Sequence, residues 1–137
     1  MTPVLTGLIV AGVAAAIWFP IVWLVDQRKL RHHRGVSRQD FIQAFAADSV
    51  TQEIPAAVYD YYKQQVVFKE YSVAPDDDYE ATLSKGDEDI DDDAAFLMKR
   101  LGLKRPSSFS AARAETRIKT LRDMVHWLNW LLQHQGT

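Results

Sequence analysis

The sequence predicts an all-α protein, in which one N-terminal apolar helix precedes a small bundle of four helices with a long acidic connection. Three observations predict it. Residues 1–25 carry no ionisable side chain, apolar residues recur at helical intervals after residue 37, and no alternating strand pattern of useful length occurs. The 137 residues are 47% apolar and 25% charged, which is typical of a chain that can bury a core.

Residues 3–25 are expected to form a transmembrane helix. At 1.5 Å per residue this stretch would be about 35 Å long, against a hydrocarbon core of about 30 Å. Trp18, Phe19 and Trp23 gather toward its C-terminal end, as in an interfacial aromatic belt. A cleaved signal peptide and a buried core helix are the alternatives. The lack of a basic n-region and the length of the run favour a retained span.

The charged residues that follow this stretch set the expected orientation. They form a basic cluster of Arg28, Lys29, Arg31, Arg34 and Arg38. Because positive charge stays on the cytoplasmic side, we expect a single-pass protein of the inner (cytoplasmic) membrane with its helical domain in the cytoplasm. The cluster could also bind anionic lipid, although a topology signal alone is the preferred interpretation. The expected divisions are a transmembrane helix over 1–25, a basic juxtamembrane segment with a short helix over 26–50, and a helical domain over 51–137.

Four helices are expected after residue 37, and their ends carry recognisable signals. Their predicted ranges are 38–47, 51–67, 94–101 and 120–135. Ser37 and Thr120 are predicted to cap the first and the last, and Gly102 is predicted to follow the third as its C′ residue. The tyrosines of the second helix are interpreted as packing residues.

The connection over 68–93 is strongly acidic, and residues 76–93, the acidic run, hold ten acidic residues against the single base Lys85. Asp92 or Asp93 is expected to cap the helix that follows. A calcium loop starting at Asp87 would need glycine at its sixth position and glutamate at its twelfth. These positions hold Asp92 and Met98, so no calcium site is predicted.

Nothing in the sequence supports catalysis, a metal site or a bound cofactor. The chain has no cysteine and none of the common nucleotide-binding, metalloprotease or serine-hydrolase motifs. His126 and His134 are eight residues apart, with no carboxylate between them on the same helical face. The net charge of −2 argues against a nucleic-acid partner for the chain as a whole.

The order of segments over residues 52–133 resembles the acyl carrier protein family. The resemblance is carried by SVAPDDDYEATL, EDIDDDAAFLMKRLG and IKTLRDMVHWL, with Pro75, Asp76 and Leu83 in the loop, Ile90 and Asp91 before the position of the modified serine, and Thr120 and Asp123 at the final cap. It implies a four-helix fold whose acidic second helix docks onto basic patches of partners. Where the family carries the serine that takes phosphopantetheine, this sequence has Asp92, and a carboxylate has no hydroxyl to accept that group.

These observations lead us to expect a non-enzymatic, membrane-anchored interaction protein that docks onto a protein with a basic surface. The residues expected to bind the partner are Asp87, Glu88, Asp89, Asp91, Asp92 and Asp93. The alternatives are a single-span accessory subunit of a larger membrane complex, a carrier that uses another attachment residue, and a merely solvated acidic loop. The basic juxtamembrane segment could also dock onto the acidic residues of its own chain.

Overall fold

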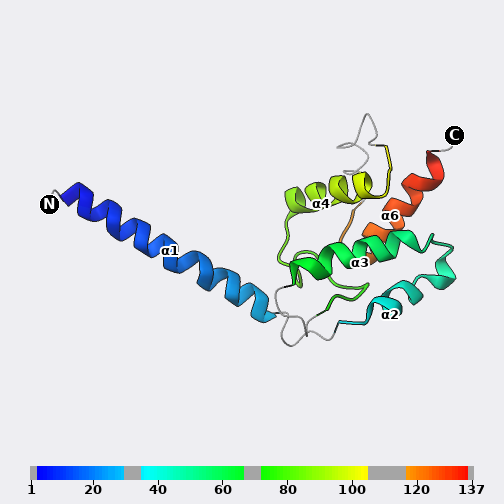
Figure 1. Cartoon of the computed structure of the whole chain (residues 1–137), viewed down its shortest axis with the longest axis horizontal. Coiled ribbons are helices and arrows are strands. Elements are labelled where there is room, and N and C mark those ends of the chain that lie inside the picture. The colour runs from blue at the N-terminus through cyan, green and yellow to red at the C-terminus, as the bar shows by residue number, and fades with distance from the viewer. Residues whose placement is uncertain (1–2, 30–34, 67–71, 105–116, 136–137) are drawn as a thin grey trace.

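A computed structural model describes residues 3–29, 35–66, 72–104 and 117–135, and within these ranges the chain is all-helical, as predicted. The α-helices are α1 (Pro3–Lys29), α2 (Arg38–Gln43), α3 (Glu53–Gln65), α4 (Asp87–Arg100) and α6 (Leu121–His134), with a 3₁₀ turn η2 (Ala46–Asp48) after α2. In Figure 1, α1 extends away from the other helices, which gather into a small bundle. Within the described ranges, α2, α3, α4 and α6 correspond to the four helices predicted after residue 37.

The long helix α1 presents its apolar side chains to the outside, with Leu8, Trp18 and Phe19 among the most exposed. Among the residues that the structure describes, no helix combines the length and apolar character that crossing a membrane requires. The predicted span over 1–25 is therefore not supported there. The side chains of the basic cluster from Arg28 to Arg34 lie outside the described residues, whereas Arg38 donates to the carboxylate of Asp60 at 2.9 Å.

The core lies around α3, which packs against α2, α4 and α6. Ile54, Val58 and Tyr62 recur every four residues along α3, and all three are buried. This spacing places them on one stripe of the helix, which can face its neighbours continuously. The other fully buried large side chains are Phe41, Phe45, Val73, Tyr79, Leu97, Met98, Leu121, Met124 and Leu128.

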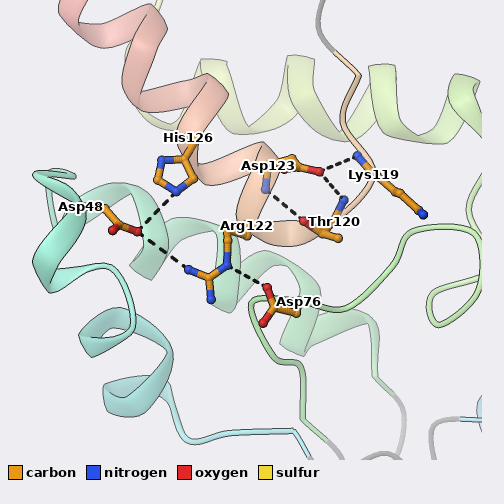
Figure 2. A network of polar contacts seen from close by, with 7 residues as sticks. All are labelled: Asp48, Asp76, Lys119, Thr120, Arg122, Asp123 and His126. Carbon is orange, nitrogen blue, oxygen red and sulfur yellow. Dashed lines mark hydrogen bonds and ion pairs between the residues drawn. The ribbon is translucent and has the colours of Figure 1, made fainter.

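Three of the predicted helix caps are confirmed, at Ser37, Thr120 and Gly102. Ser37 Oγ accepts the N–H of Asp40 at 3.1 Å at the start of α2. At the start of α6, Thr120 Oγ1 accepts the N–H of Asp123, whose carboxylate accepts the N–H of Thr120 in return (Figure 2). Gly102 follows α4 with a φ of 69°, a left-handed conformation that suits glycine at C′. Local hydrogen bonding thus fixes these ends as the sequence indicates.

The start of α4 differs from the prediction. The helix begins at Asp87, seven residues before the predicted start at residue 94, so neither Asp92 nor Asp93 caps it. Gly86 is the N-cap residue, and Asp89 Oδ2 accepts its N–H at 3.2 Å. Negative charge is favourable in the first turn of a helix, because the unpaired N–H groups there carry partial positive charge. Asp87 to Asp93 were expected to lie before the helix. They instead form its first two turns, and the acids of the first turn stabilise its start.

The chain before α2 is joined to the segment after residue 71 by close backbone contacts. The N–H of Val36 donates to the carbonyl oxygen of Val73 at 3.1 Å, and Ser72 Oγ donates to the carbonyl oxygen of Val36 at 2.7 Å. A Cβ added at Gly35 would lie 2.2 Å from the carbonyl carbon of Ser72. Only glycine therefore allows the two segments to approach this closely.

Gly35→Ala is expected to lower the free energy of unfolding by about 1–3 kcal/mol, because the added methyl group forces the two backbones apart. Gly12→Ala in α1 is the matched control, since a Cβ there meets nothing within 4 Å. Urea unfolding followed by circular dichroism measures both variants. Coinciding transitions for the two alanine variants would contradict the close approach at Gly35.

Candidate functional site

The fold divides the acidic run into two parts. The first part, residues 76–80, lies in the connection before α4 and stabilises turns there. Asp77 is buried, and its Oδ2 accepts the N–H of Ala74 at 2.7 Å. Asp78 Oδ1 accepts the N–H groups of Glu80 and Ala81 at 2.9 and 2.8 Å. Carboxylates that bond to nearby backbone N–H groups in this way stabilise turns. Asp77 and Asp78 are therefore structural residues.

Arg122 joins this connection to α6 and to the turn η2 (Figure 2). Its Nε donates to Asp76 Oδ1 at 2.8 Å, and its Nη1 lies 3.8 Å from Asp48 Oδ2. The same carboxylate oxygen lies 3.4 Å from Nε2 of His126, and the guanidinium stands over the ring of Phe45 at 5.3 Å. The hydrogen bond to Asp76 is the main cause of the raised pKa of Arg122. This cluster holds three segments together.

The second part of the acidic run forms the first two turns of α4 and faces solvent. Asp87, Glu88, Asp89 and Asp92 are exposed, and we call these four residues the acidic face of α4. Asp91, which was predicted with them, is half-buried. The acidic face is the candidate functional site, because it concentrates like charges on one helix and exposes them.

Asp93 does not belong to this face, which corrects the predicted set of docking residues. Asp93 is only 4% exposed, because it lies one helical turn after buried Ile90 and so points to the core side of α4. Its carboxylate accepts the phenolic O–H groups of Tyr61 at 2.5 Å and Tyr62 at 2.9 Å. Lys85 Nζ donates to it at 2.9 Å. Asp93 is therefore a buried anchor, which a partner cannot reach.

Tyr79 and Lys85, which lie in the connection before α4, belong to the same hydrogen-bond network as Asp93. The phenolic oxygens of Tyr62 and Tyr79 are 2.7 Å apart, and Lys85 Nζ stands over the ring of Tyr62 at 5.5 Å from its centroid. The sequence predicts packing for the tyrosines of α3 but does not predict their hydrogen bonds. The one signal it held was the position of Lys85, the single base in the acidic run. The network fixes the position of α4 against α3.

Burial raises the pKa values of two tyrosines in this network. Desolvation, followed by the hydrogen bond to Asp93, raises the pKa of Tyr61 to about 12. The pKa of Tyr62 lies further above its ordinary range, again chiefly through desolvation, with the neighbouring Tyr79 and Asp93 adding to the shift. In both cases the environment disfavours the phenolate.

The stability of the protein is therefore expected to fall as the pH rises from about 10 to 12. Below the ordinary tyrosine pKa of about 10, the phenol is neutral in both the folded and unfolded states, and its stabilisation is complete. Above it, the unfolded state ionises while Tyr61 in the folded state remains neutral up to about 12, which favours unfolding. Urea midpoints measured across this range should fall less steeply in Tyr61→Phe than in the unsubstituted chain. Parallel slopes would contradict this assignment.

The resemblance to carrier proteins implies that Asp92 occupies the position of the modified serine, at the start of a helix. Asp92 is the sixth residue of α4, so it lies within the helix rather than at its first turn. The hydroxyl nearest to the helix head in sequence is that of Ser84, which is exposed, has a φ of 54° and precedes the N-cap Gly86 by two residues.

Metal binding has no basis in the described part of the chain. No group of three or more His, Asp or Glu side chains there is placed to hold an ion. The run from Asp87 to Met98 that was compared with a calcium loop is continuous helix in α4. A calcium loop must wrap its oxygens around the ion, which a helix does not do.

Comparisons of the chain with protein-family models, with curated proteins and with solved structures find no match. No function is therefore carried over from a relative. The proposals below depend on the charges, exposure and contacts of the described residues.

Proposed function

We propose that this chain is a non-enzymatic docking protein, whose helical domain presents the acidic face of α4 to a partner protein with a basic surface. The observation that carries the proposal is the exposure of four carboxylates within two turns of one helix. Among the residues that the structure describes, the ion pairs are made by other acids, namely Asp48, Asp60, Asp76, Asp78 and Asp93. The charges of the acidic face are therefore accessible to a ligand.

Physical chemistry favours a cationic protein as that ligand. Like charges three and four residues apart on a helix repel each other, and this repulsion offsets part of the stabilisation that the acids give to the first turn of α4. A basic surface relieves this repulsion when it binds. Such complementarity raises the association rate and specificity of a complex more than its affinity. The anchoring of Asp93 by Lys85 supports a rigid presentation of the face.

A carrier-like domain without the prosthetic arm is part of this proposal. The order α3, acidic connection, α4 and α6 is compatible with the carrier-protein resemblance. Asp92 has no side-chain hydroxyl, so it cannot form the phosphate ester by which a serine carries the phosphopantetheine arm. Recognition of a partner is then the property of the carrier fold that this chain would retain.

The exposed apolar side chains of α1 support a second part of the proposal, namely attachment of the chain to the cytoplasmic membrane. Residues 3–25 contain no charged side chain, and α1 projects from the bundle (Figure 1). Alkaline extraction of membranes that contain the full chain tests it. Retention in the lipid fraction is expected, and release with peripheral proteins would overturn the attachment.

The docking role is tested by comparing two triple variants of the full chain as baits. One variant neutralises α4 through Glu88→Gln, Asp89→Asn and Asp92→Asn. The control neutralises three exposed acids elsewhere through Asp40→Asn, Glu53→Gln and Glu80→Gln. We expect the α4 variant to lose the co-purifying partner and the control to keep it.

Retention of the partner by both variants would overturn docking through α4. It would favour the alternative, a single-span accessory subunit that associates through α1. Substitution of the exposed Leu8 by lysine then separates the two functions, because only association through α1 would be lost.

A further inference from the structure

An exposed aromatic side chain lies next to the acidic face of α4. Phe96 is 50% exposed, although it is a large apolar residue on the helix that carries the acids. Its ring lies 4.9 Å from that of Tyr61 between centroids, at an interplanar angle of 31°. One side of the ring is therefore supported by Tyr61, and the exposure of Phe96 leaves the other side for a ligand.

The support beneath Phe96 is firmly held. The ring of Tyr61 also meets that of Tyr62 edge-on, with centroids 5.0 Å apart and an angle of 83°. The phenolic O–H of Tyr61 donates to the buried carboxylate of Asp93. An aromatic side chain held in this way loses little conformational freedom when a ligand covers it, which is typical of interface residues that contribute strongly to binding.

Helical spacing places Asp92 beside this ring. Residues four apart on a helix are neighbours, with Cβ atoms about 5–6 Å apart. Asp89, seven residues before Phe96, lies on the same stripe one turn further on. The basic residues Lys99 and Arg100 follow Phe96 at the other end of α4. A cation is therefore attracted to the N-terminal side of the ring and repelled from its C-terminal side.

We propose that Phe96 and Asp92 form an arginine-selective contact for the basic partner, in which a guanidinium stacks on the Phe96 ring and pairs with the Asp92 carboxylate. This inference rests on the docking role proposed above and specifies the chemistry of the partner. A guanidinium is planar, stacks on aromatic faces and donates to carboxylates in a fork geometry. A lysine ammonium is a compact, strongly hydrated charge that pairs with the carboxylate without stacking.

Two synthetic amphipathic helical peptides test this selectivity. Both carry leucines on one face and the same number of cations on the other, arginine in the first peptide and lysine in the second. Their affinities for the full chain in nonionic detergent are measured by fluorescence anisotropy. We expect the arginine peptide to bind about two- to fivefold more tightly.

The variants decide whether the Phe96 ring causes the preference. Phe96→Leu keeps an apolar side chain but removes the aromatic face, so the preference for arginine should fall to the part that fork pairing with Asp92 supplies. Trp130→Leu is the matched control, because Trp130 is 49% exposed on α6, outside the acidic face, and this variant should keep the preference. Asp92→Asn should weaken the binding of both peptides.

The outcomes separate this inference from the docking role. Equal binding of both peptides by the unsubstituted chain, or a preference that is undiminished in Phe96→Leu, would overturn arginine selection on the Phe96 ring and leave docking intact. Failure of the unsubstituted chain to bind either peptide would overturn both proposals.

Discussion

Asp93→Asn is expected to lower the free energy of unfolding by about 2–4 kcal/mol, because it removes the charge of a buried carboxylate that accepts hydrogen bonds from two phenols and from the partly buried ammonium of Lys85. Asparagine has nearly the same shape, so packing is preserved while the negative charge is lost. The ammonium of Lys85 would then face an amide, and the phenols of Tyr61 and Tyr62 would lose a charged acceptor. For a domain whose total stability is about 5–15 kcal/mol, this is a large fraction. Urea unfolding at neutral pH measures it.

Asp92→Asn provides the control for this experiment. It makes the same chemical change one residue earlier on α4, at an exposed position, and should alter stability by no more than about 0.5 kcal/mol. Adding Lys85→Met to Asp93→Asn should recover part of the loss, since it removes the partly buried charge left without a partner. Indistinguishable urea midpoints for the two single asparagine variants would contradict the anchoring role of Asp93.

Leu128→Ala is the second substitution with a large expected effect, a loss of about 2–5 kcal/mol in the free energy of unfolding. Leu128 is completely buried on α6, and truncation would remove its apolar contacts and leave a cavity in the core. Leu132, one turn later on the same helix, is 40% exposed. Leu132→Ala should cost less than about 1 kcal/mol, because water already reaches much of that side chain. Calorimetric melting of both variants would contradict the proposed core if the two transitions were lowered equally.

Several helix ends could be predicted, because they depend only on residues nearby in the sequence. Ser37, Thr120 and Gly102 act within three to five residues of their own positions, so their caps can be recognised without a tertiary structure. The start of α4 could not be recognised in the same way. Aspartate disfavours helix interiors and is common in loops, whereas the cap at Gly86 and the dipole of the first turn favour it here.

The burial of Asp93 depends on contacts between distant residues. Its phenolic donors lie 31 and 32 residues earlier in the chain, on a different helix. A run of adjacent aspartates gives no indication of which one faces the core unless the helix start is known, because a shift of a few residues changes the inward side.

The intact mass of the full chain, after co-expression with a phosphopantetheinyl transferase, most directly tests the claim of a docking protein without a prosthetic arm. An unmodified chain of 15.6 kDa is the expected result, because the carboxylate of Asp92 cannot accept the arm. A pantetheine-sized increase in mass would contradict the claim. If this increase in mass were lost in Ser84→Ala, the Ser84 hydroxyl would be the attachment point and the protein would be a working carrier.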